Sequence, residues 1–459
     1  MNIYIRIEVF RREFEGRLWL AMVAAERGHR VLLGKLRHRD FVGSAPDLFP
    51  PGVFHDKSLT PRPSRFAFQT GLAERGFVLT SQDEEHGLTL EDMVRFLSRR
   101  FSAESLQNAR ASFAWGPQEV RELKSLFPLQ ADQVIETGSP RVDLWRPDLA
   151  YRGSAGALAA EGIEAGFVLI ASSLSPFGVN PTWMAVGDAR GAYFNGLEDA
   201  REFEIYRRRG QAYFFIADFI HAIRSAALAL PHMTFVIRPH PFEDVRAWPV
   251  AIGPVPNVRV VASGSISPWI QHAKALVHNG STTAIEAAVR GVPVIAFDPP
   301  SAGSEQSFVN HLGARAASAS ELRDLLSETD WVSRQADESS VILRRRIGAL
   351  EGDFAADRIV SEWETLDDGT LSQDWRLPIS GQKSLRSRLA AVVQRASSPA
   401  AGRDQDLAAA PRMDSDHKFL PLDARLVAET ARHLAEATGR FSDVRVAVIG
   451  ERLIEVRSV

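Results

Sequence analysis

The segment AKALVHNGSTTAIEAAVRGVPVIAFDP, residues 273–299, constrains the fold of this chain most strongly. An apolar run leads into a turn of small polar residues at 279–283, and an amphipathic helix pattern follows at 284–290. Gly291 stands where a helix C-cap belongs, and the continuous apolar run at 292–297 suits a strand that is buried on both faces. The segment therefore predicts a βαβ unit in a parallel sheet.

The turn before this helix has the features of an anion-binding site. A helix N-terminus exposes backbone N–H groups, and this one lies at the carboxyl end of a parallel strand. Glu286, one turn inside the helix, is placed to reach the hydroxyls of a ribose attached to a bound phosphate. The predicted phosphate-binding residues are Asn279, Gly280, Ser281, Thr282 and Thr283. A capped βαβ unit without a ligand is the alternative.

A second motif, TFVIRPHPFED at residues 234–244, begins as an apolar strand and ends in a rigid turn. Two prolines alternate with Arg238 and His240 there. Because proline fixes φ and favours extended geometry in the residue before it, both cationic side chains have little freedom. Arginine is a forked donor, and histidine changes protonation state near neutral pH. We therefore predict that both residues bind the phosphate of a nucleoside monophosphate or diphosphate, although a structural histidine is the commoner use of a lone His–Pro pair.

Composition limits the classes to which the chain can belong. A chain of 459 residues exceeds the size of one growing core, so two domains are expected. The net charge of −3 argues against nucleic acid as the main partner. Cysteine is absent, which excludes disulfides and thiolate metal sites and is compatible with a cytoplasmic location.

Two hydrophobic or charged regions bear on membrane contact. The start of the chain has charges within its apolar alternation, so it does not predict a signal peptide. The apolar stretch 212–230 includes Asp218, His221 and Arg224 and predicts a buried amphipathic helix rather than a membrane span. Residues 1–40 carry nine basic and five acidic residues, an excess of four positive charges. Peripheral contact with a membrane or an anionic acceptor is one interpretation of that excess, and a solvated helix face is the other.

Strand and helix patterns alternate along the first third of the chain. Residues 3–9 alternate as a strand, an amphipathic helix continues to Gly28, and residues 31–34 predict the next strand. Later strand patterns at 77–80, 112–116 and 133–138 alternate with helix patterns at about 89–100 and 117–126. This alternation implies an α/β fold with a doubly wound parallel sheet.

The pattern restarts at 167–173, after a stretch rich in Pro, Gly and Ala, and indicates a second domain of the same kind. Ser172 and Ser173 follow its first strand and are expected to contribute to phosphate binding at the same crevice. The second domain is expected to close in a long polar helix around 334–366. The predicted divisions are Rossmann-like domains at 1–146 and 147–366, a flexible linker at 367–415 and a small helix and hairpin at 416–459.

Several motifs together resemble a known family. These are VIRPHP, the segment around 273–299, TGSPRVDLWRP at 137–147, the opening REFEGRLWLAMVAAERGHRVLLG and HKFLPLDARLVAETARHL near residues 417–434. They look like the bacterial surface carbohydrate biosynthesis proteins, which are GT-B proteins similar to capsule and lipopolysaccharide Kdo transferases and to bacterial sialyltransferases. The resemblance implies two Rossmann-like domains facing a crevice, no cofactor, no metal, a nucleotide-sugar donor and a glycan or glycolipid acceptor.

The resemblance also implies a catalytic acid loop. The related enzymes carry an acidic pair before a glycine at the end of an N-domain strand, and an HP motif whose histidine faces the donor phosphate. FVLTSQDEEHGL, at 77–88, matches this in part, because His86 separates Glu85 from Gly87. The base that activates the acceptor therefore stays open between Glu84 and Glu85, with Asp83 third, and His240 takes the role of the histidine at the phosphate.

The sequence leads to one functional prediction and two alternatives. The chain is expected to be a metal-independent glycosyltransferase at the cytoplasmic face of the membrane, with CMP-Kdo or a related CMP-ulosonic acid as the first donor. A CDP-glycerol-type phosphotransferase has a similar HP turn and Ser-rich helix start. A non-catalytic nucleotide-sugar-binding assembly factor is the third possibility. In the turn TGSPRVDL, Arg141 and Asp143 either lock the turn or bind substrate.

Overall fold

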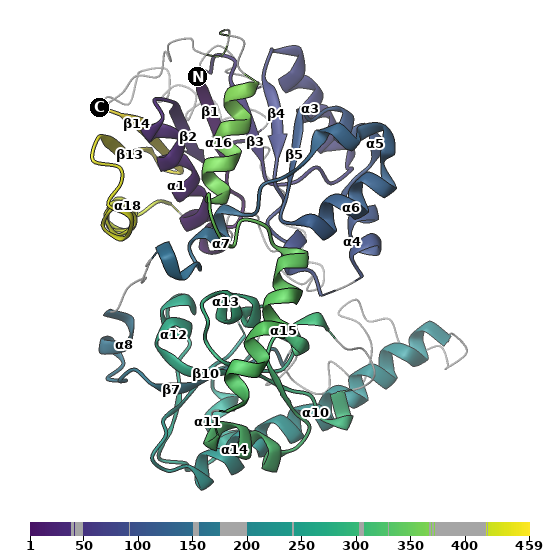
Figure 1. Ribbon diagram of the computed structural model, residues 1–459, viewed down its shortest axis with the longest axis vertical. Helices are drawn as coiled ribbons and strands as arrows, with labels where there is room; N and C mark the ends of the chain where they lie inside the picture. Colours follow the sequence, from purple (N-terminus) through teal and green to yellow (C-terminus); the bar gives the residue numbers. More distant parts are fainter. Residues whose placement is uncertain are drawn as a thin grey trace, which may run out of the picture.

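The computed structural model contains two lobes, each built on one sheet (Figure 1). Both sheets are parallel except at the two-stranded edge that the C-terminal hairpin adds to the first. The structure describes residues 1–37, 41, 49–90, 92–149, 156–174, 200–240, 243–302, 307–328, 330–366, 369, 371, 419 and 421–459. Most of the predicted linker 367–415 lies outside these residues.

The first sheet has the strand order β13-β14-β2-β1-β3-β4-β5-β6. Its parallel strands are β1 (Asn2–Arg6), β2 (Arg30–Gly34), β3 (Val53–Asp56), β4 (Val78–Ser81), β5 (Ala111–Ala114) and β6 (Val134–Glu136). Its helices are α1 (Phe10–Glu26), α3 (Pro63–Glu74), α4 (Met93–Arg100), α5 (Ala103–Gln107), α6 (Pro117–Leu126) and α7 (Pro140–Asp143). Ile3 and Ile5 pack on one face and Tyr4 on the other, and all three are fully buried. The sheet is therefore covered on both sides, as a parallel sheet requires.

The second sheet has the strand order β12-β11-β10-β7-β8-β9. Its strands are β7 (Phe167–Ala171), β8 (Phe235–Arg238), β9 (Val258–Val260), β10 (Ala273–His278), β11 (Val294–Phe297) and β12 (Ala314–Ala316). Its helices are α8 (Gly156–Ala160), α10 (Ala200–Ala229), α11 (Ala247–Ile252), α12 (Ser267–His272), α13 (Thr283–Val289), α14 (Ala319–Ser327) and α15 (Trp331–Arg346). The predicted βαβ unit is present as β10, α13 and β11, which lie side by side and parallel. The prediction of two doubly wound α/β domains is confirmed.

Helix α10 contains the long apolar stretch that the sequence assigned to a buried amphipathic helix. Phe219, Ala222, Ile223 and Ala226 on this helix are fully buried against the second sheet. In the part of the chain that the structure describes, no helix is long and apolar enough to cross a bilayer.

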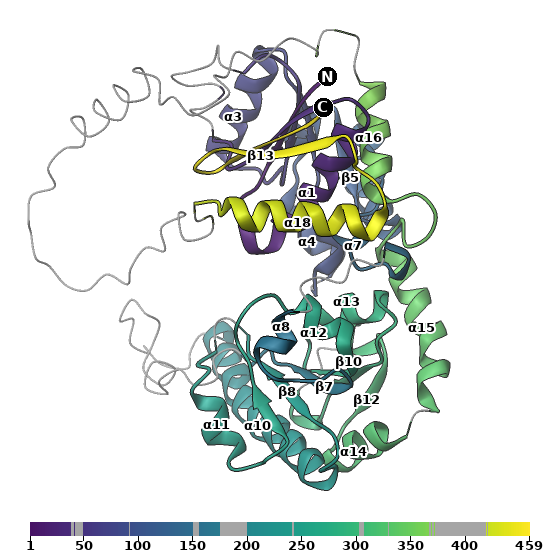
Figure 2. The same cartoon turned by 90° about the vertical axis from the view of Figure 1, so that its left-hand side faces the viewer.

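The C-terminal hairpin belongs to the first sheet, as Figure 2 shows. The predicted helix and hairpin are present as α18 (Ala424–Thr438), β13 (Val444–Gly450) and β14 (Leu453–Ser458). Strand β14 runs antiparallel to β2, with Leu453 opposite Gly34. A Cβ at Gly34 would lie 2.1 Å from the carbonyl oxygen of Arg452, and its φ is +152°. Glycine is therefore the residue that lets the hairpin approach β2 so closely.

The chain crosses between the lobes twice, once after α7 and once after α15 (Figure 1). Where the sequence predicted one long helix around 334–366, the structure has two, because α15 ends at Arg346 and α16 (Ala355–Thr365) begins nine residues later. Helix α16 packs on α1 of the first domain, although the division predicted from sequence placed it in the second. Arg146 spans the two crossings by donating to the carbonyl oxygens of Ala349 (2.9 Å) and Gly352 (2.9 Å).

Asp143, at the end of α7, holds the returning chain in place. Its carboxylate accepts backbone N–H groups from Ala355 (2.8 Å) and Ala356 (2.9 Å), at the start of α16. It also accepts the indole N–H of Trp19 on α1 (3.0 Å). A single buried side chain thus caps one helix and ties it to another. This settles the choice left open for Asp143 in favour of locking the turn.

We expect Asp143→Ala to lower the free energy of unfolding by about 3 kcal/mol, because three buried donors would each lose their acceptor. Asp132→Ala, an exposed aspartate of the same domain, is the control and should be nearly neutral. Urea unfolding followed by circular dichroism measures both. Equal midpoints for the two variants would contradict this role of Asp143.

Candidate functional site

The predicted nucleotide-binding residues gather at one edge of the second sheet. Strands β8, β7 and β10 are adjacent, and Ala171 pairs in register with Arg238 on one side and His278 on the other. Because the three strands are parallel, the residues that follow them emerge at the same edge. The structure therefore brings together His240 after β8, Ser172 and Ser173 after β7, and the turn 279–283 after β10.

The turn 279–283 is organised by His278, a residue that the sequence analysis did not assign. His278 is fully buried, and its Nδ1 accepts N–H groups from Gly280 (3.1 Å) and Ser281 (3.3 Å). Burial lowers the pKa of His278 to about 3, so the ring is neutral and carries its proton on Nε2. Two of the turn's N–H groups therefore point back into the protein and do not face a ligand.

The side chains that remain at the start of α13 are polar and half-buried. The hydroxyls of Ser281 and Thr283 are 2.8 Å apart, and Ser281 Oγ also accepts the N–H of Thr283 at 3.4 Å. The N–H of Thr282 has no acceptor among the described residues. The donors available to a phosphate here are thus the hydroxyls of Ser281, Thr282 and Thr283 and the N–H of Thr282, without the N–H groups of Gly280 and Ser281.

The ends of β7 and β10 are joined by side-chain contacts. Asn279 Oδ1 accepts the N–H of Ser173 at 2.8 Å. Ser172 donates its hydroxyl to Glu243 at 2.8 Å, and Glu243 also accepts the indole N–H of Trp248 at 2.9 Å. Glu243 was missed from the sequence, although it lies within the quoted RPHPFED motif. Asn279, Ser172 and Glu243 shape this edge, and in this structure the Ser172 hydroxyl is already used.

Arg238, predicted to bind phosphate, contacts protein groups in this structure. Its guanidinium donates to the carbonyl oxygens of Ser263 (2.6 Å) and Gly264 (2.8 Å) and lies 5.4 Å from the centre of the Trp269 ring. Burial lowers the pKa of Arg238 to about 10, and Glu161 opposes this shift. Both arms of the fork therefore fix a neighbouring turn. Arg238 supports the site, while His240, two residues on and half-buried, lies at the sheet edge itself.

Glu286, predicted to anchor a ribose, lies one turn into α13 and is largely buried. Arg290, on the next turn, contacts its carboxylate at 3.1 Å. Arg290 also donates to the carbonyl oxygen of Leu144 in the first crossing, at 3.3 Å. Glu286 is therefore held in one position at the junction between the domains.

The acidic loop follows β4 and faces the start of α1. Glu84 is buried, and its Oε1 lies 2.7 Å from the Nε of Arg17. Its second oxygen, Oε2, is buried with no hydrogen-bond partner among the described residues. Burial raises the pKa of Glu84, and the charge of Arg17 opposes that shift. A carboxylate of raised pKa with one unused oxygen has the properties of a general base.

Asp83 and the inserted His86 form a structural ion pair. His86 is buried with its Nε2 3.4 Å from Asp83 and its Nδ1 bonded to Glu119. Burial opposes the charge on both partners, but the two carboxylates outweigh it and raise the pKa of His86 to about 10. His86 and Arg100 likewise hold the pKa of Asp83 below its usual range. Asp83 is thus held as an anion, which makes it the weakest base of the three candidates.

Glu85 is the most exposed acid of the loop, with 40% of its side chain accessible. It contacts Arg12 at 2.6 Å and is also bonded to Arg100. Arg12 and Arg17 come from the REFEGR segment, whose function the sequence analysis left unassigned. That segment places two arginines of α1 directly on the acidic loop.

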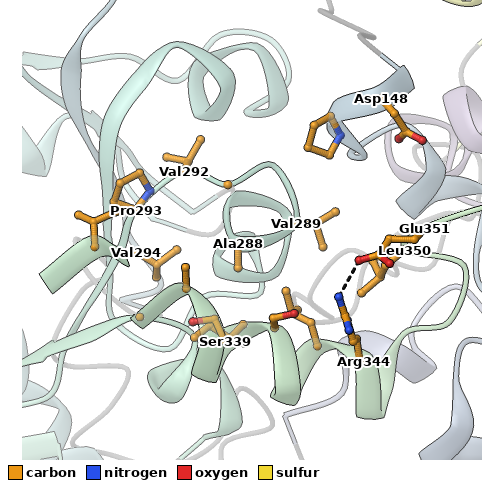
Figure 3. A pocket seen from close by; sticks show the side chains of 18 of the residues that line it. Asp148, Ala288, Val289, Val292, Pro293, Val294, Ser339, Arg344, Leu350 and Glu351 are labelled. Carbon is orange, nitrogen blue, oxygen red and sulfur yellow. Dashed lines mark hydrogen bonds and ion pairs between the residues drawn. The ribbon is translucent and has the colours of Figure 1, made fainter. Parts of the chain in front are cut away.

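A separate cavity of about 490 Å³ lies at the other end of α13 (Figure 3). Ala288, Val289 and Leu343 line it, and Arg344 and Glu351, 2.6 Å apart, stand at one side. The predicted phosphate-binding residues do not line it. Within the described residues, no group of three or more His, Asp or Glu side chains is placed to hold a metal ion.

Comparison with known proteins identifies the fold. No protein-family model and no curated protein sequence matches the chain. A putative UDP-N-acetylglucosamine 2-epimerase from Listeria monocytogenes matches in structure with a TM-score of 0.52 and 13% identity, over 80% of this chain and 97% of that one. Another UDP-N-acetylglucosamine 2-epimerase matches with a TM-score of 0.50 and 13% identity, over 83% and 98% of the two chains. The fold is of the GT-B type.

We expect His86→Gln to destabilise the protein by about 3–5 kcal/mol near pH 6, the scale for removing one partner of a buried ion pair. The pKa of His86 is raised on folding, so its contribution is complete below pH 6.5 and is lost as the pH rises towards 10. The difference in unfolding free energy between variant and wild type, measured at pH 6, 8 and 9.5, should therefore become smaller as the pH rises. His232→Gln, on an exposed histidine, is the control, and a difference independent of pH would refute the assignment.

Proposed function

We propose that the chain is a glycosyltransferase that uses a nucleotide-activated sugar in the assembly of surface polysaccharide or lipopolysaccharide. The observation that carries this proposal is the meeting of His240, the Ser281–Thr283 helix start and Glu286 at one sheet edge, with Glu84 presented from the other domain. The resemblance to Kdo transferases makes CMP-Kdo or a related CMP-ulosonic acid the first donor. A glycan or glycolipid is the proposed acceptor.

In this proposal, the donor nucleotide lies along the edge of β8, β7 and β10. The hydroxyls of Ser281 and Thr283 and the N–H of Thr282 bind the phosphate, with His240 on its other side. Glu286 accepts hydrogen bonds from the ribose, because Arg290 holds its carboxylate at a fixed position one turn along α13. Ser172, Ser173 and Asn279 keep the strand ends in place.

Glu84 is the proposed base that removes the proton from the acceptor hydroxyl. Burial raises its pKa, which makes its carboxylate more basic than an exposed one, and its Oε2 has no described partner. Glu85 is the second choice, because its carboxylate is already bonded to two arginines, Arg12 and Arg100. Domain closure would bring the loop to the acceptor, as is common for enzymes built from two lobes.

Nucleotide binding tests the first part of the proposal. We expect CMP, CDP, UDP or GDP to raise the melting temperature with concentration, since a ligand at 100 times its Kd adds about 2.7 kcal/mol. Glu286→Gln and His240→Ala should each weaken that nucleotide about tenfold, as expected when one hydrogen bond to a charged group is lost. Glu328→Gln and His232→Ala, both at exposed positions, are the matched controls. No shift with any nucleotide would overturn the proposal.

Base removal tests the second part. The assay uses a sugar donor activated with the nucleotide that binds. Glu84→Gln should slow sugar transfer to the acceptor by about a hundredfold or more, while still binding the nucleotide. Glu85→Gln should have the smaller effect, and Asp83→Asn should act mainly on stability. Full activity in Glu84→Gln with loss in Glu85→Gln would transfer the role to Glu85. Normal activity in all three variants would favour a retaining mechanism. If the wild-type protein shows no turnover, the assembly-factor alternative is favoured.

The matching structures define one further outcome of this assay. The two epimerases with the same fold are named for UDP-N-acetylglucosamine. This sugar nucleotide therefore belongs among the compounds assayed. Its conversion to an isomer without any acceptor would replace transfer with epimerisation as the function.

A further inference from the structure

Arg141 lies where the two domains and the crossing chain meet. It is the second residue of α7, and α1 packs directly on it, because a Cβ at Gly16 would be only 2.9 Å from the Arg141 Cα. Figures 1 and 2 place α7 at the junction, between α1 and the upper end of the second domain where α13 begins. The backbone of Arg141 is thus fixed, and only its side chain has freedom to meet a ligand.

The guanidinium of Arg141 has an unused donor. Its Nη1 is buried and has no acceptor among the described residues, while its Cζ lies 5.3 Å from the centre of the Trp145 ring. Nη1 of Arg17 and Oε2 of Glu84 are buried in the same region and also have no partner within the described part of the chain, and there Arg17 Nε and Glu84 Oε1 are 2.7 Å apart. Buried polar groups are almost always paired, so unused groups that cluster here indicate a ligand.

The charges around Arg141 come from both domains. Burial lowers its pKa, whereas Glu84 of the first domain and Glu286 of the second act to raise it. Glu84 is the proposed base and Glu286 the proposed ribose anchor, so Arg141 interacts with charges on both the acceptor side and the donor side. The transferred sugar and its phosphate must lie between these same two residues.

Resting on the proposed transfer reaction, we propose that Arg141 is a further catalytic residue, whose guanidinium binds the phosphate as it leaves the sugar. In the reaction, the acceptor hydroxyl gives its proton to Glu84 and its oxygen bonds to the anomeric carbon. The bond from that carbon to the phosphate oxygen breaks, and the electron pair stays on the phosphate. One negative charge is therefore lost at Glu84 and one appears on the phosphate.

Arg141 suits this movement of charge because it is near both positions. Before the reaction, the ionised Glu84 balances the positive charge of Arg141. Afterwards the phosphate balances it, so the guanidinium has an anionic neighbour throughout. A donor fixed in advance toward a developing charge is worth about a hundredfold to a thousandfold in rate. The same reasoning predicts that an ionised Glu84 weakens phosphate binding by occupying part of the arginine's charge.

Binding of simple nucleotides separates this inference from the proposed function. Two pairs of ligands that differ only by the phosphate, CMP with cytidine and UMP with uridine, are used in calorimetric titrations. The proteins are wild type, Arg141→Gln, Glu84→Gln and the double variant. Arg121→Gln, at an exposed site, is the control. We expect Arg141→Gln to weaken the monophosphate about tenfold and to leave the nucleoside unchanged. Glu84→Gln, which mimics the protonated base, should bind the monophosphate several-fold more tightly, and the double variant should lose that gain.

Each result decides between the two claims. If wild type binds a monophosphate and Arg141→Gln binds it equally well, the role of Arg141 is overturned and the proposed function stands. If wild type binds neither these four compounds nor CDP, UDP and GDP, both fall together. Unchanged nucleoside binding shows that the variant is folded. If Arg141→Gln fails to fold, Arg141→Lys takes its place. It should keep only part of the difference in affinity between monophosphate and nucleoside, because an ammonium lacks the planar fork. An undiminished difference in affinity would overturn the role of Arg141.

Discussion

The carboxylate of Asp143 is the contact on which the two-domain arrangement depends. The chain leaves the first domain after α7 and comes back at α16, and this one side chain joins the exit and the return by bonding to Ala355, Ala356 and the Trp19 indole. Without it, α16 would start with unpaired N–H groups against a buried helix. The position of α7 in turn sets where Arg141 stands, so the geometry of the domain junction follows from a helix cap.

Charge is arranged on the acidic loop so that its three carboxylates differ. Asp83 is paired with an imidazolium and Glu85 with two arginines, whereas Glu84 is paired with one arginine and has a second oxygen without a partner among the described residues. Three neighbouring acids in the sequence therefore have three different sets of contacts in the fold. The REFEGR segment explains the difference, because Arg12 and Arg17, both on α1, reach adjacent members of the loop.

Hydrophobic periodicity predicted the fold well, and side-chain roles less well. The βαβ unit at 273–299, the opening strands and helices and the C-terminal helix were all indicated by patterns of burial that depend only on local sequence. Arg238 and His278 show the limit of this approach. The direction of the Arg238 side chain is decided by the carbonyl group of Ser263, 25 residues further along the chain. His278 orders a turn, but in the sequence it cannot be told apart from any other residue at the end of a strand. The pairing of β14 with β2 carries no local signal at all.

That pairing has a consequence for the order in which the protein forms during synthesis. Strand β2 lies at the edge of the parallel part of the first sheet until β14 is made, and β14 emerges from the ribosome only after the whole second domain. An uncovered edge strand invites pairing with other chains. Domains commonly fold in the order in which they are made, but here the earlier domain is completed last, so a nascent chain presents an open edge to chaperones or to its neighbours for most of its translation.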